Sequence, residues 1–146
     1  MPQDTPWLPA VPDYAANVAY EMYPGMQGQD DARDAARHML AAGTLARKYG
    51  PEWAERLGRW HEYRTSPLAA LKTLLGVGQM PPDYRQDLHN NALGIELARR
   101  ASSQIELENL VNQLAERSAL TQTPGRPWIN KAHGGLAQMK ECNCGR

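Results

Sequence analysis

The sequence predicts an all-α protein: a compact bundle of five or six helices with an extended N-terminal arm and an extended C-terminal tail. Three observations predict this fold class. Proline and glycine divide the chain into segments of helical length, and apolar residues recur within these segments at helical spacing. No stretch alternates apolar and polar residues over the length of a strand. The 146 residues suit one domain with its own core.

The first three helices are expected at residues 13–23, 30–49 and 51–64. Two aspartates in the first turn of the second helix complement the positive end of its dipole. Gly50 follows the end of that helix and permits a left-handed cap. Pro51 suits the first position of the third helix, because its missing N–H would have no partner there.

Three further helices are expected at residues 67–75, 83–101 and 103–120. The fourth begins with Pro67, again a residue suited to a first helical position. The sixth begins with a Ser-x-x-Glu sequence at 103–106, which is typical of a capping box.

These helices divide the chain into an arm (1–12), a single helical domain (13–120) and an extended or partly disordered tail (121–146). Proline- and glycine-rich arms often become ordered only against a partner. We therefore expect a protein partner to bind through the arms, and an oligomer is compatible with the same feature. Cys142 and Cys144 lie one residue apart in the tail and form no disulfide framework.

Composition excludes several classes of protein. Sixteen Lys and Arg balance sixteen Asp and Glu, so general nucleic-acid binding is not expected. No apolar run approaches the ~20 residues of a transmembrane helix, and the first residues lack the pattern of a secretory signal. The expected location is the cytoplasm, or the virion if the chain is phage-encoded.

Polar residues interrupt the expected apolar stripes of three helices. In the second helix Asp34 and His38 lie four residues apart and therefore on one side. In the third, the stripe is Trp53, Leu57, Trp60, His61 and Arg64, with Glu62 at its edge. In the fifth, the stripe is Tyr84, Asp87, Leu88, Asn91, Ile95 and Ala98, flanked by His89 and Asn90.

Burying an unpaired amide or carboxylate costs on the order of 2–7 kcal/mol. The inward polar groups are therefore expected to pair with one another where the second, third and fifth helices meet. The expected cluster contains Asp34, His38, His61, Glu62, Asp87 and Asn91.

Such a cluster has the groups that acid–base catalysis needs. A carboxylate can fix the tautomer of a histidine, which can then move a proton near neutral pH. An asparagine amide can bind a substrate oxygen. The candidate catalytic residues are His38, His61, Glu62, Asp87 and Asn91, and the candidate substrate-binding residues are Asp34, Arg37 and Asn90.

No cofactor is identified by the sequence, but the same residue types bind divalent metals such as Zn or Mn. The candidate metal ligands are His38, His61, Glu62 and Asp87. No His-Glu-x-x-His sequence supports this hypothesis. The alternative is that the polar residues are satisfied core groups, with the aspartates of the second helix acting only on its dipole.

Three segments together resemble a known family. They are residues 34–38 (DAARH), 61–62 (HE) and 87–94 (DLHNNALG). In this order and spacing they resemble an uncharacterised helical domain of bacterial and phage proteins. Its pattern is Asp-Ala-x-Arg-His-Ala, then His-Glu, then Asp-x-x-Asn-Asn-x-x-Gly. The resemblance covers residues 30–101 and implies an all-α fold with a polar site, but no established activity. It singles out Asp34, Arg37, His38, His61, Glu62, Asp87, Asn90, Asn91 and Gly94.

Two functions follow as hypotheses. The first is a hydrolase in which the cluster activates water by general acid–base catalysis, with or without a metal, because no serine or cysteine in the cluster suits a nucleophile. The alternative is a non-catalytic phage virion or ejection component, or another interaction protein, in which the cluster is a buried hydrogen-bond network.

Overall fold

The computed structural model describes residues 10–26, 31–65, 67–76 and 82–116, except for a few side chains within the helices. All regular secondary structure in these residues is helical, which confirms the predicted all-α bundle. The helices are α1 (Val11–Met22), α2 (Ala32–Tyr49), α3 (Pro51–Thr65), α4 (Pro67–Leu74), α5 (Pro82–Arg100) and α6 (Gln104–Glu116). Helix α1 begins two residues before its predicted start, within the predicted arm. The rest of the arm and the tail over 121–146 lie outside the described residues.

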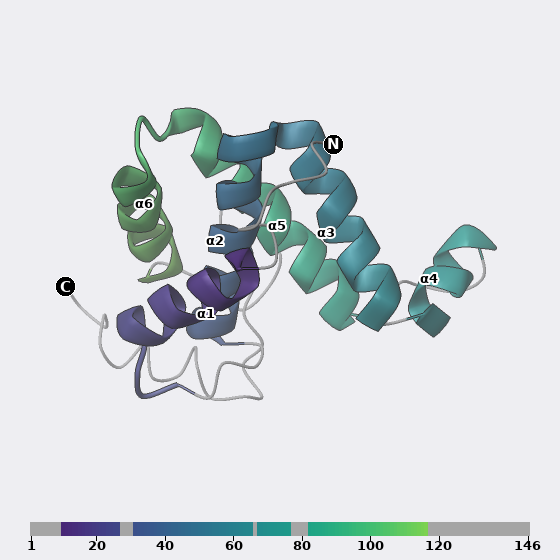
Figure 1. Ribbon diagram of the computed structural model, residues 1–146. Coiled ribbons are helices and arrows are strands. Elements are labelled where there is room, and N and C mark those ends of the chain that lie inside the picture. Colours follow the sequence, from purple (N-terminus) through teal and green to yellow (C-terminus); the bar gives the residue numbers. More distant parts are fainter. Residues whose placement is uncertain (1–9, 27–30, 66, 77–81, 117–146) are drawn as a thin grey trace.

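Helix α2 is the centre of the bundle. It contacts α1, α3, α5 and α6, whereas α4 packs against α3 and projects beyond the other helices (Figure 1). Alanine dominates the buried side of α2: Ala32, Ala35, Ala36, Ala42 and Ala46. Because the distance between packed helices depends on the side chains at their contact, this alanine-rich surface lets its neighbours approach closely.

The closest approach is between α2 and α5. A Cβ placed on Gly94 would lie 2.2 Å from the carbonyl oxygen of Met39, and one placed on Gly43 would lie 2.8 Å from the carbonyl oxygen of Gly94. The two backbones therefore touch at this crossing, and each glycine leaves room for the other helix. The N-terminal halves of α2 and α5 also lie side by side, since Nε2 of His38 lies 3.2 Å from Oδ1 of Asp87.

Local capping fixes the helix ends near the crossing. The carboxylate of Asp31 accepts a hydrogen bond from the Asp34 N–H at 3.0 Å, so α2 begins at Ala32. At the other end Gly50 has φ +92° and ψ 157°, a backbone conformation that glycine adopts readily but that differs from the predicted left-handed helical cap. In α6, Ser103 Oγ accepts from the Glu106 N–H at 3.0 Å, and Glu106 accepts from the Ser102 N–H.

The predicted inward stripe of α3 is wrong at its tryptophans. Trp53 and Trp60 are 38% and 56% exposed, whereas Ala54 is buried. Since α3 packs on the alanine-rich helix α2, its contacting face carries small residues, and the two large rings lie at the edge of the interface.

The predicted face of α5 is also displaced. Gln86 and Asn90 are 2% and 0% exposed, whereas Asp87 and Asn91 are only partly buried. The face closest to α2 follows the four-residue spacing of Gln86, Asn90 and Gly94, because the glycine sets the point of contact. Asp87 and Asn91 consequently lie at the margin of this interface.

Each helix in the described part of the chain is too short or too polar to cross a bilayer.

Candidate functional site

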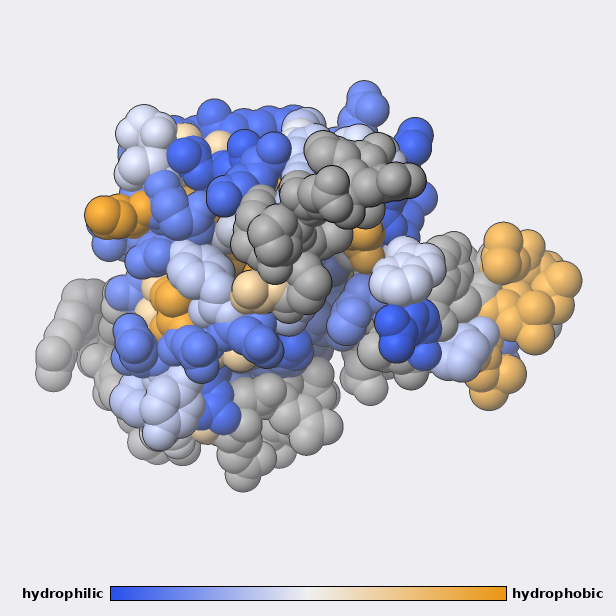
Figure 2. Space-filling model, viewed as in Figure 1, coloured by the Kyte–Doolittle hydropathy of each residue, from blue (hydrophilic) through white to orange (hydrophobic). Residues whose placement is uncertain are grey.

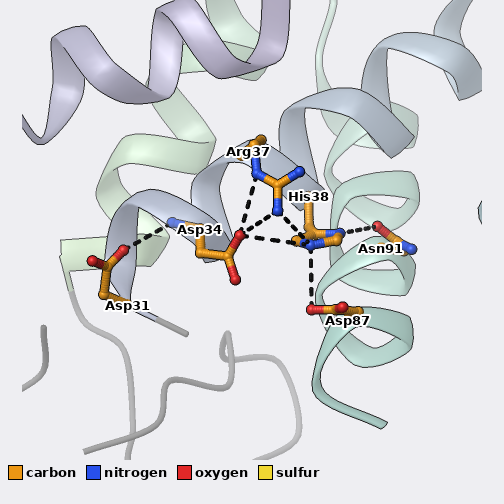
Figure 3. A network of polar contacts seen from close by, with 6 residues as sticks. All are labelled: Asp31, Asp34, Arg37, His38, Asp87 and Asn91. Atoms are coloured by element: carbon orange, nitrogen blue, oxygen red, sulfur yellow. Dashed lines mark hydrogen bonds and ion pairs between the residues drawn. The ribbon is translucent and has the colours of Figure 1, made fainter. Parts of the chain in front are cut away.

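A polar network centred on His38 joins α2 to α5 (Figure 3). The imidazole is buried, and its Nδ1 lies 3.2 Å from Oδ1 of Asn91. Its Nε2 lies 3.2 Å from Oδ1 of Asp87 and 3.7 Å from Oδ1 of Asp34. The i,i+4 spacing on α2 brings Asp34 to His38, and the α2–α5 crossing brings Asp87 and Asn91 to the other side of the ring.

Arg37 supplies the positive charge of this network. Its Nε donates to Oδ1 of Asp34 at 3.2 Å, its Nη2 also contacts that oxygen, and Nη2 lies 3.1 Å from Nε2 of His38. The side chain of Asp34 is almost fully buried, whereas that of Arg37 is 40% exposed. A guanidinium that reaches in from the surface therefore neutralises a buried carboxylate.

The environment of His38 favours a neutral imidazole. Burial lowers the pKa of His38 to about 4, and the charge of Arg37 acts in the same direction, although the negative charge of Asp34 opposes the shift. At neutral pH the ring thus carries one proton. Since Oδ1 of Asn91 can only accept a hydrogen bond, that proton belongs on Nδ1, and the lone pair of Nε2 accepts a hydrogen bond from Nη2 of Arg37 at 3.1 Å.

Three potential metal ligands converge at this point. One oxygen of Asp34, Nε2 of His38 and one oxygen of Asp87 all lie within 4.8 Å of one another. Imidazole nitrogen and carboxylate oxygen are ligands that Zn and Mn accept. Metal-bound histidines usually donate their other ring N–H to an oxygen acceptor, and Asn91 occupies that position here.

A cavity of about 500 Å³ adjoins the network, within the size range of small-molecule sites. Arg37, His38 and Asn91 line it on one side, and residues of α3, including His61, line it on another. The network therefore lies beside a space large enough for a substrate.

The sequence-predicted cluster is assembled in part. The structure brings together Asp34, Arg37, His38, Asp87 and Asn91. His61 lines the same cavity from α3 and its charge acts on His38, but it is not one of the three groups whose ligand atoms lie within 4.8 Å of one another. Its predicted roles in catalysis and metal binding stay predictions.

The surroundings of His61 differ from those of His38, because its side chain is largely exposed. Its pKa is lowered, first by partial burial and then by the charges of Arg37 and Arg64. Like His38, it is therefore neutral at neutral pH.

Asn90 and Glu62 are the two remaining residues that the sequence predicts for the site. Asn90 is fully buried, and it is not among the described residues that line the cavity. The side chain of Glu62 lies outside the described part of the structure, so its predicted roles in catalysis and metal binding stay predictions.

Two residues that support the site were not among the predicted site residues. Asp31 caps α2 through the N–H of Asp34 and so fixes the turn that carries that carboxylate. Gly58 lets α3 approach Asn91, because a Cβ at this position would lie 3.3 Å from Asn91 Nδ2. A glycine inside a helix is the signal that could have identified Gly58.

Comparison with known protein families gives one result. The model of a family described as "Domain of unknown function (DUF6973)" matches residues 9–121. Comparison with curated proteins and with solved structures finds no match. The family match confirms the expected likeness to an uncharacterised domain, and it includes all the residues of the His38 network.

Proposed function

Because the chain belongs to the DUF6973 family, whose function is unknown, we propose its function from the site itself. The protein is a hydrolase in which Asp34, His38 and Asp87 hold a divalent metal ion that activates water. The observation that carries this proposal is the convergence of a neutral imidazole lone pair with two carboxylate oxygens beside a cavity.

Three protein ligands leave coordination positions for water and substrate. A zinc ion held there would lower the pKa of its bound water from 15.7 to about 7 and so would supply hydroxide near neutral pH. That hydroxide would add to the electrophilic centre of the substrate as the bond to the leaving group breaks. The neutral ring of His61, in the cavity wall, is suited to accept the proton that the water releases and to pass it to the leaving group.

Arg37 is the residue that links metal binding to catalysis in this proposal. Its guanidinium contacts both Asp34 and Nε2 of His38, so a metal ion would take over two of its interactions. Its half-exposed side chain already lines the cavity, so the guanidinium can reach a substrate bound there once the metal ion has replaced it. There it can stabilise negative charge on a substrate oxygen during attack.

Asp87→Asn tests this proposal. We expect the wild-type protein, loaded with Zn or Mn, to hydrolyse at least one class in a panel of nitrophenyl esters, phosphate esters and anilides. Asp87→Asn should reduce kcat/KM by about 100-fold or more, because it removes a charged ligand. Glu96→Gln is the matched control, since Glu96 is exposed on the same helix and pairs with Arg99. Absence of hydrolysis across the panel, or full activity of Asp87→Asn, would contradict the proposal.

A non-catalytic interaction protein, such as a virion component, is the second candidate function. It is favoured by the apolar surface that Figure 2 shows on the projecting helix α4. This surface contains Leu68, Leu71 and Leu74 of α4 and the following Leu75, which are 52–73% exposed. In that case the network fixes the register of α2 against α5, and Asp87→Asn lowers the melting temperature while no activity is found. The cytoplasmic and virion locations stay predictions under either function.

A further inference from the structure

The cavity beside His38 extends well beyond the metal ligands. Asp34 and Asp87 do not line it, whereas residues of α1, α2 and α3 do. Its volume of about 500 Å³ is far larger than a metal ion and its water need. The cavity therefore has room for the body of a ligand in addition to the group that reacts.

Most of the cavity wall is apolar. Leu45 of α2, Leu57 of α3 and Val11 of α1 face it, together with several alanines. The ring of Trp60 also lines the cavity and remains 56% exposed, so it forms part of the opening toward solvent. Such a wall stabilises an apolar ligand body, at about 25 cal/mol for each Å² removed from water.

The charged side chains that line the cavity are both cationic. They are Arg37 and Arg64, and none of the described lining residues is acidic. After partial burial, both charges also lower the pKa of His61, which lines the same cavity.

Arg64 differs from Arg37 in its partners. Arg37 pairs with Asp34, whereas the guanidinium of Arg64 lies 5.1 Å from the centre of the Trp60 ring and forms no salt bridge with a described carboxylate. The ring positions this cation at the opening without neutralising it. A guanidinium in this state is suited to a carboxylate or phosphate group of a ligand.

We propose that the cavity binds an amphiphilic anion, with its apolar body against Leu45 and Leu57 and its carboxylate or phosphate on Arg64. The inference deepens the proposed function, because it names the substrate class of the same site. It does not require a metal for binding, since neither Arg64 nor the apolar wall belongs to the Asp34–His38–Asp87 group.

The test is a calorimetric titration in EDTA with four ligands that share one chain length: decanoate, decyl phosphate, decanol and decyltrimethylammonium, each below its micelle concentration. We expect at least one anion to bind about 10-fold more tightly than decanol and the ammonium compound. The comparison of decanoate with decyl phosphate identifies which headgroup the site prefers.

Arg64→Gln should weaken binding of the preferred anion about 10-fold and leave decanol binding unchanged. Arg59→Gln is the matched control, because Arg59 is exposed on the same helix, pairs with Glu55 and does not line this cavity. Both arginines are exposed, so both variants should fold.

The inference is overturned if decanol binds as tightly as the anions, if none of the four binds, or if the two arginine variants behave alike. Its failure is distinguishable from failure of the proposed hydrolase. Selective anion binding in EDTA without metal-dependent hydrolysis supports the inference alone, and hydrolysis without anion selectivity supports the hydrolase alone.

Discussion

Gly94→Ala is expected to lower the free energy of unfolding by about 3 kcal/mol. The added methyl group would lie 2.2 Å from the carbonyl oxygen of Met39 and 2.7 Å from its Cα, whereas ordinary contacts begin near 3.4 Å. These neighbours are backbone atoms, so α2 and α5 must separate by about 1 Å. The higher helix propensity of alanine offsets only about 1 kcal/mol of this loss.

Urea denaturation followed by circular dichroism measures the effect, and Gly25→Ala is the control. Gly25 has no atom within 4 Å of an added Cβ, so its substitution should change stability by less than about 0.5 kcal/mol. The same separation of helices would move His38 away from Asp87 and Asn91, so metal affinity should fall together with stability. A Gly94→Ala protein as stable as the wild type would show that α2 and α5 do not touch at this point.

The metal-free protein should lose roughly 2 kcal/mol of stability as the pH falls from 7 to 5. The pKa of His38 is lowered to about 4 in the folded state by burial, so the unfolded chain binds the proton more tightly. The stabilising contribution is complete above the unfolded pKa near 6.5. It is lost as the pH falls through that value toward 4, where the folded ring also becomes protonated.

The groups that face His38 support this pH window. They are Asp34 and Arg37 on α2, Asp87 and Asn91 on α5, and His61 across the cavity. Carboxylates titrate mainly below pH 5, so measurement between pH 7 and 5 isolates the histidines. The charge of Arg37 opposes protonation of His38 and therefore acts in the same direction as burial.

Chemical denaturation at several pH values in EDTA gives the stability profile. His38→Gln should remove most of the dependence of the free energy of unfolding on pH. His61→Gln should keep most of this dependence, because His61 is exposed. An NMR titration of the His38 ring gives the same information without a variant. A folded-state pKa of His38 at or above 6.5 would contradict the buried, neutral imidazole.

Much of the fold could be predicted from the sequence because local chemistry determines it. Pro51 and Gly50 mark the α2–α3 boundary, and the Ser-x-x-Glu sequence at 103–106 marks the start of α6. These signals act within one or two turns of helix, so neighbours in the sequence are sufficient to identify them.

The faces of α3 and α5 could not be predicted in the same way. Which side of α5 is buried depends on the contact of Gly94 with Met39, residues that are distant in the sequence. A prediction from apolar spacing also assumes that large side chains point inward. The surface of α2 is rich in alanine, however, so Trp53 and Trp60 lie at the edge of the interface between α2 and α3.

The candidate site was predictable where it depends on helical spacing. The i,i+4 pairs on α2 and α5 bring their members to one side of each helix, and the structure joins the two pairs through His38. The separation of His61 from this group depends on how α3 packs, which the spacing of residues within α3 does not determine.

The measurement that tests the account most directly is metal content by plasma mass spectrometry on tag-free protein. The protein is loaded with Zn or Mn and then dialysed, beside His38→Gln and His61→Gln. We expect one equivalent of metal in the wild type and in His61→Gln, and none in folded His38→Gln, because Nε2 of His38 is one of the three proposed ligands and His61 is not. A wild-type protein that retains neither metal, or a His38→Gln protein that retains one equivalent, would contradict the proposed metal site.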